Sequence, residues 1–322
     1  MTQANFSDSG DALLTAAAHD MPPPVFAAVD GAQFDDLLAV LKDAGLSFRS
    51  LFLGVADAES EKAGPWFVDV NMTRSMDAFL ALVGDQPAAV FWSCPAGESA
   101  LYRHLRMLNE AIVPLPRGDA PERAAGAARP ASDYRDARVL FRHWDPRVLV
   151  DVLPVLDEAQ FARVLGPAAL VMIPREGGGA PFTAPAVDAS LIAPQGPLRM
   201  RAEQLDAISD RRAAQSRRRI VGYLRDVAPD QTGDVDDRRL AKMVHYAETS
   251  AGAFGVRSER AVGLWAYMLA TSQNDFPREW TVKRFRTATD LDASPEQRVK
   301  MLFDARQRSL AGHGKWSPKP SN

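Results

Sequence analysis

The stretch Pro174–Pro197, PREGGGAPFTAPAVDASLIAPQGP, divides this sequence of 322 residues into two parts of different character. Nine of its 24 residues are glycine or proline, including the run Gly177–Gly179. Such a composition interrupts helices and strands and is typical of a connection between structural units. We therefore predict a boundary here, with 187–192 as a candidate strand inside it.

Before this stretch, short apolar runs alternate with amphipathic segments. The side chains Phe34, Leu37, Leu38 and Leu41 fall on one face of a helix, the spacing expected where a helix covers a sheet. Strands are predicted at 25–30, 51–55, 66–70, 88–92, 110–115, 138–142 and 169–173, and helices near 34–41, 75–83, 98–107, 146–153 and 158–165. Between two of the strands, 116–136 is rich in Pro, Gly, Ala and Arg and is predicted to be an inserted loop.

After Leu198, every strong pattern is helical, with helices predicted at 201–227, 235–254, 259–273 and 295–310. The predicted fold class is therefore an α/β N-terminal lobe, with a mixed sheet flanked by helices, followed by an all-α C-terminal lobe. The expected divisions are a flexible leader at 1–23, the α/β lobe at 24–174, a linker at 175–197, the helical lobe at 198–312 and a tail at 313–322.

Composition places the chain among ordinary globular proteins. Hydrophobic residues make up 46%, charged residues 25%, and the formal net charge is −3, which gives no global attraction to nucleic acid. A single cysteine, Cys94, excludes an internal disulfide and suits a reducing compartment. The first Lys or Arg is Lys42, and no apolar run is long enough to span a bilayer. We expect a cytoplasmic protein without membrane insertion.

Strong catalytic motifs are absent from the sequence: there is no phosphate-binding loop, dinucleotide fingerprint, zinc-protease motif or nucleophile elbow. None of the five histidines has a His or Cys partner at metal-ligand spacing, so no metal or cofactor is expected. His143 stands two residues before Asp145, as a base and its orienting carboxylate can, but Asp145-Pro146 is also a helix start. A hydrolase or transferase that uses His143 or Cys94 in a site between the lobes remains an alternative.

Two features of the helical lobe are candidates for partner contact. Arg211, Arg212, Arg218 and Arg219 fall within one broad helix face, which is either a solvated and partly paired surface or a docking surface for an acidic protein. Trp265 and Tyr267 point to different faces of one helix, so we expect one of the two to be exposed, and Trp265 is our candidate contact.

Several motifs in fixed order resemble the effector-loading adaptor or chaperone family of type VI secretion, the Tap or TEC adaptors. They are Leu51–Gly54, Gly64–Val68, Phe91–Ser93, Leu101–Arg106 and, most specifically, Val139–Leu149, VLFRHWDPRVL. The resemblance is strong over 25–173 and continues more weakly through 199–204 and 254–259. The sequence departs from the family pattern at the long 116–136 loop and at His143-Trp144, which replaces a commoner aromatic pair.

The resemblance implies a cytoplasmic, non-enzymatic adaptor that binds the N-terminal region of one effector and loads it onto the spike protein VgrG, with a PAAR-type tip as a further candidate partner. It marks Arg106, Arg142, Asp145 and Arg147 as candidate contacts. For Arg142, Asp145 and Arg147, a helix cap with a buried ion pair is the alternative role. An immunity protein that blocks a toxin remains a further alternative for the whole chain.

Overall fold

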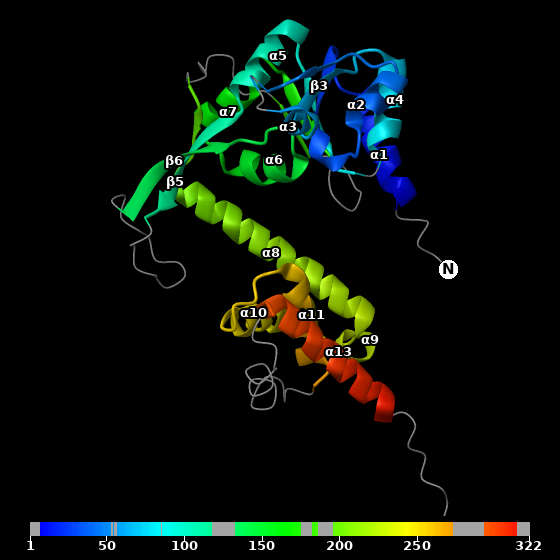
Figure 1. Cartoon of the computed structure of the whole chain (residues 1–322), viewed down its shortest axis with the longest axis vertical. Helices are drawn as coiled ribbons and strands as arrows, with labels where there is room; N and C mark the ends of the chain where they lie inside the picture. Colours follow the sequence, from blue (N-terminus) through cyan, green and yellow to red (C-terminus); the bar gives the residue numbers. More distant parts are fainter. Residues whose placement is uncertain are drawn as a thin grey trace, which may run out of the picture. The chain divides into compact units, whose positions relative to one another are not determined.

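The computed structural model describes residues 7–52, 54, 57–84, 86–117, 133–174, 182–185, 196–272 and 293–313. The chain divides into two compact units, Met1–Ser209 and Asp210–Asn322. The first unit combines strands with helices and the second is helical, so the predicted fold class is confirmed (Figure 1). Among the described helices, none combines the length and apolar character that crossing a bilayer requires.

The first unit is built on a six-stranded sheet with the strand order β2-β3-β1-β4-β7-β8. Its strands are β1 (Val25–Asp30), β2 (Phe48–Ser50), β3 (Pro65–Asp69), β4 (Ala89–Ser93), β7 (Leu170–Ile173) and β8 (Phe182–Pro185). All neighbouring strands run antiparallel. A smaller sheet pairs β5 (Glu110–Pro116) with β6 (Tyr134–Leu140) antiparallel and with β9 (Leu198–Arg199) parallel.

Both faces of the six-stranded sheet are covered by helices. Successive side chains of a strand point to opposite faces, so Val25, Ala27 and Val29 of β1 enter one core while Phe26 and Ala28 enter the other. The first core includes side chains of α1 (Ser7–His19), α2 (Leu37–Asp43) and α4 (Thr73–Val83). The second includes those of α5 (Glu98–Met107), α6 (Pro146–Val152) and α7 (Glu158–Leu165). Burial on both faces explains why the central strands read as continuous apolar runs.

The helix starts follow the capping residues in the sequence. The Asp145 side chain accepts from the backbone N–H of Arg147 at the start of α6. Asp157 caps α7 in a reciprocal capping box with Gln160. Because each cap satisfies backbone N–H groups that have no partner inside the helix, both helices begin where the sequence predicts.

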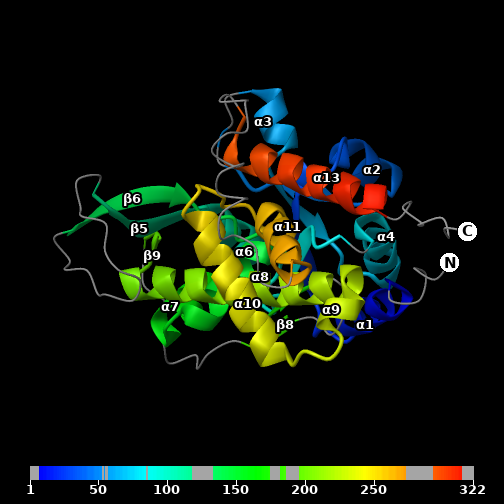
Figure 2. The ribbon, with the colours of Figure 1, turned by 90° about the horizontal axis from the view of Figure 1, so that it is seen from below.

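Three expectations for the first unit need correction. Residues 7–19 of the expected leader form α1, because Ala18 is buried against the core and His19 Nε2 lies 2.8 Å from Asp77 Oδ1 on α4 (Figure 1 and Figure 2). The strand expected at 51–55 is displaced to β2, where pairing with β3 fixes its register. The expected loop at 116–136 is shorter, because Pro116 pairs with Tyr134 and both strands extend into it.

The division between the two units falls within α8 (Ala202–Val227) and not in the glycine- and proline-rich stretch. The reason is that the apolar side chains near each end of α8 pack into different cores. Ile208 joins the core of the first unit, whereas Ile220 and Leu224 join that of the second. The candidate strand at 187–192 lies outside the described residues.

The second unit contains the later part of α8 and the helices α9 (Pro229–Thr232), α10 (Asp237–Gly252), α11 (Glu259–Ala270) and α13 (Pro295–His313). The apolar faces of α8, α10, α11 and α13 form one core. The predicted helices at 201–227, 235–254, 259–273 and 295–310 correspond to α8, α10, α11 and α13. Except for His313, the expected tail at 313–322 lies outside the described residues.

Candidate functional site

The polar residues of the Val139–Leu149 motif form an internal network at the end of β1. Arg142 Nη2 donates to Asp30 Oδ2 at 2.6 Å and lies 3.4 Å from Asp145 Oδ2. The side chains of Asp30 and Asp145 are 3% and 10% exposed, so both carboxylates lie below the protein surface. Arg142 and Asp145 thus join β1 to the start of α6, whereas Arg147 is exposed in the first turn of that helix.

His143 and Cys94, the residues of the enzymatic alternative, are both buried in the first unit. His143 is fully buried, and its Nε2 lies 3.0 Å from Asn109 Oδ1. Burial, with a smaller contribution from nearby His104, lowers the pKa of His143 to about 3. Burial likewise raises the pKa of the Cys94 thiol. Neither side chain is placed to meet a substrate, and both favour the neutral form at ordinary pH.

The arginines of α8 contribute to packing within the second unit. Arg219 forms two hydrogen bonds with Glu259 at the start of α11, of 2.9 and 2.7 Å, and this pairing lowers the pKa of Glu259. The neighbouring Arg217 pairs with Glu248 of α10 at 3.0 Å. Arg211, Arg212 and Arg218 are exposed. A docking role for the face of α8 that carries these arginines remains a prediction. Arg219 already pairs with Glu259 and joins α8 to α11.

Trp265 is buried completely, which corrects its placement among exposed partner contacts. Its indole N–H donates to Ser250 Oγ on α10 at 3.0 Å, and its ring lies 5.6 Å from that of Phe254. Helix spacing predicted two faces for α11, but α11 packs against both α10 and α13. Tyr267, on the other face, is half-buried and contacts Phe303 of α13.

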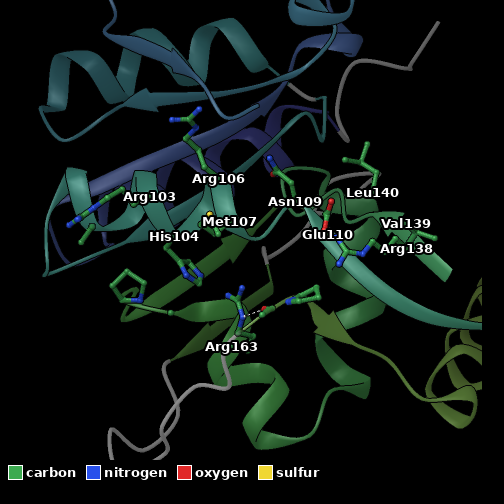
Figure 3. Close-up of a pocket in the computed structure, with 15 residues that line it drawn as sticks. Arg103, His104, Arg106, Met107, Asn109, Glu110, Arg138, Val139, Leu140 and Arg163 are labelled. Atoms are coloured by element: carbon green, nitrogen blue, oxygen red, sulfur yellow. Dashed lines mark hydrogen bonds and ion pairs between the residues drawn. The ribbon is translucent and has the colours of Figure 1, made fainter. Parts of the chain in front are cut away.

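Arg106 is the sequence candidate that borders an open groove in the first unit. Its Nη2 donates to the Phe52 carbonyl at 3.1 Å, and its guanidinium lies 5.3 Å from the ring centre of Tyr102. The groove has a volume of about 970 Å³ and lies between α5, the start of the β5–β6 pair and the end of α7 (Figure 3). We call it the arginine groove; it is lined by Ala100, Arg103, His104, Arg106, Met107, Asn109, Glu110, Arg138, Val139, Leu140, Arg163, Gly166, Pro167, Gly196 and Pro197.

Four arginines and one carboxylate give the groove a positive charge. Arg138 pairs with the carboxylate, Glu110, at 2.9 Å. The other three donate to backbone carbonyls: Arg103 to Ser99 at 3.1 Å, Arg106 to Phe52, and Arg163 to Gly196 at 2.8 Å. Burial lowers the pKa of Arg163, yet a guanidinium stays protonated in proteins. Three cations therefore line the groove without a carboxylate partner among the described residues.

Aliphatic side chains lie beside these cations. Met107 at the end of α5 is 64% exposed, and Leu140 and Val139 at the end of β6 are 55% and 36% exposed. Figure 3 shows Arg103, Arg106 and Met107 projecting from α5, with Arg138, Val139 and Leu140 on the strand. Exposed apolar side chains grouped with arginine are typical of protein-binding surfaces.

Residues 25–163 match the family model described as a domain of unknown function (DUF4123). The DUF4123 match runs from β1 into α7 and covers less than half of the chain. All residues of the groove lie within it except Gly166, Pro167, Gly196 and Pro197. Searches of curated proteins and of solved structures gave no match.

Sequence reasoning missed most of the groove, which lies largely in the segment that matches DUF4123. Arg103 and Arg106 share the quoted run Leu101–Arg106, and their spacing of three places them on neighbouring helix positions. That spacing was a usable signal for Arg103. Arg138 and Arg163 gave none, because the tertiary fold brings a strand end and a second helix to α5.

The wall of the groove contains a glycine that does not tolerate a side chain. Gly166 ends α7 with φ 56°, and a Cβ there would lie 2.3 Å from the His104 ring. His104 is held by a 2.9 Å contact between its Nε2 and the Val164 carbonyl. Gly166→Ala should therefore destabilise the first unit by about 2–4 kcal/mol, from left-handed strain together with overpacking.

The matched control for this prediction is Gly84→Ala. Gly84 ends α4 with φ 50°, but nothing lies within 4 Å of its added Cβ. Gly84→Ala should cost about 1–2 kcal/mol, the strain alone. Urea unfolding of both variants measures the difference, and equal losses would show that the His104 contact is not tight.

Proposed function

We propose that this chain is a non-enzymatic cytoplasmic adaptor that binds the N-terminal region of a type VI secretion effector and loads it onto the VgrG spike protein. The observation that carries the proposal is the arginine groove. It places exposed aliphatic side chains next to arginines with no carboxylate partner among the described residues, largely within the segment that matches DUF4123. Arginine and methionine are enriched in protein interfaces.

The resemblance to the Tap or TEC adaptors supports the same role, since its motifs fall in the matched segment. Arg142 and Asp145, which lie in the most specific of these motifs, act inside the fold. Partner contact is therefore assigned to the groove, with the exposed arginines of α8 as a second candidate surface. An adaptor needs two such surfaces, one for cargo and one for spike.

The two alternative functions make different demands on the molecule. A hydrolase or transferase that relied on His143 or Cys94 needs a reachable base or nucleophile, and both residues are buried. An immunity protein would bind the catalytic domain of a toxin, whereas an adaptor binds the region that precedes it. The binding site on the partner separates these two functions.

The test is affinity purification of the tagged full-length chain from cells that express the neighbouring secretion genes, followed by mass spectrometry. We expect VgrG and one effector to be recovered. Deleting the N-terminal region of that effector should abolish its recovery, and deleting its toxin domain should not. The reverse dependence would favour an immunity protein, and recovery of neither partner would contradict the proposal.

A further inference from the structure

We infer that the arginine groove binds an acidic segment of the cargo protein that also carries aliphatic side chains. The inference rests on the proposed adaptor function for the identity of the partner, while the chemistry of the segment follows from the groove itself. Carboxylates are the groups that three arginines without carboxylate partners recognise. The surrounding chain has a net charge of −3, so this positive surface is local.

The arginines are held ready for such a ligand. Arg163 and Arg106 are fixed by backbone carbonyls of Gly196 and Phe52, and Arg106 also lies against the Tyr102 ring. A guanidinium held through one or two of its N–H groups keeps others for a carboxylate. Because the side chains are already ordered, binding costs less conformational entropy than it would with free arginines.

The aliphatic lining distinguishes a peptide from other anions. A phosphate or a small carboxylate would leave Met107, Val139 and Leu140 in water. Single-stranded nucleic acid binds grooves in which bases stack on aromatic rings. None of the lining residues is Phe, Tyr or Trp, and the ring of the lining His104 is packed against Gly166 and held at the Val164 carbonyl. A peptide with both carboxylates and aliphatic side chains satisfies the arginines and covers the apolar surface. The volume of about 970 Å³ accommodates several residues of such a segment.

Site-specific photo-crosslinking in the same cells tests where the cargo sits. A photoreactive phenylalanine analogue replaces Met107 in the groove or, as a control, Met72 at the start of α4. These methionines are 64% and 67% exposed, so the two positions are equally accessible. We expect Met107 to crosslink to an effector segment rich in Asp, Glu and aliphatic residues, and Met72 to give no such product.

Charge and apolar contact are tested separately with the purified effector region from the affinity experiment. Arg103→Glu and Leu140→Ser should each weaken its binding about ten-fold or more. The matched controls are Arg74→Glu on α4 and Leu13→Ser on α1, both at exposed positions of the first unit. These should leave binding unchanged. Raising the salt concentration should weaken wild-type binding more than that of Arg103→Glu.

The outcomes separate this inference from the adaptor proposal. If the effector co-purifies but gives no crosslink from Met107, or crosslinks from Met72 instead, the groove inference is wrong and the adaptor function stands. A crosslinked segment that is basic, or that belongs to a second copy of this chain, also overturns the inference. If no effector co-purifies with any variant, the adaptor function itself fails.

Discussion

Replacing Trp265 with alanine should unfold the second unit at a lower denaturant concentration, with a loss of about 3–5 kcal/mol in its free energy of unfolding. Trp265 is completely buried among the helices of that unit, and its indole N–H bonds to Ser250 on α10. Alanine removes the ring from the core and leaves a cavity. The expected result is an early loss of helical circular dichroism in a urea titration, ahead of the first unit.

Trp265→Phe is the control for this substitution. Phenylalanine retains much of the buried area but cannot donate to Ser250 Oγ, so it should cost about 1–3 kcal/mol. On the proposed adaptor function, effector binding by Trp265→Phe should remain, because the Trp265 side chain is buried among core residues. If Trp265→Ala were as stable as the wild type and had lost effector binding, Trp265 would be an exposed partner contact and this prediction would be wrong.

The first unit should lose stability as the pH falls below about 6.5, the ordinary pKa of histidine. The folded state holds the pKa of His143 at about 3 because the ring is fully buried. Between these two values the unfolded chain binds a proton that the folded chain does not. The contribution of His143 is therefore fully present above pH 6.5 and declines by about 1.4 kcal/mol per pH unit toward the lower pKa.

The substitution His143→Gln isolates this contribution. Glutamine keeps an amide that can bond to Asn109 but does not titrate. The His143→Gln variant should be less stable than the wild type at neutral pH, and its stability should depend less on pH between 6.5 and about 5. Burial also lowers the pKa of His104, so a smaller slope of the same sign should remain. Urea unfolding across this pH range measures both, and identical slopes in wild type and His143→Gln would refute a buried neutral His143.

These two predictions separate structural residues from residues available for binding. His143 and Trp265 both invited a functional interpretation, one as a base and one as an aromatic contact. Their burial makes them parts of the two cores. The exposed side chains of the arginine groove are less conspicuous in the sequence but are accessible to a partner.

The sequence by itself determined the elements and their class. Continuous apolar runs such as Val25–Val29 identified buried strands, and Asp145 marked a helix start through its capping chemistry. These signals are local: a strand's alternation and a cap's hydrogen bond each involve residues a few positions apart. The order of an α/β part and a helical part followed from them.

Tertiary structure determined the contacts between segments that are far apart in the sequence. The short edge strand β2 takes its position from pairing with β3, and α1 is placed by packing on α4. The periodicity of α11 indicated which residues share a face. It did not indicate that α10 and α13 cover both faces. The arginine groove exists because α5, β6 and α7, far apart in the chain, converge. Charge and exposure at such a place depend on through-space neighbours, which no local pattern specifies.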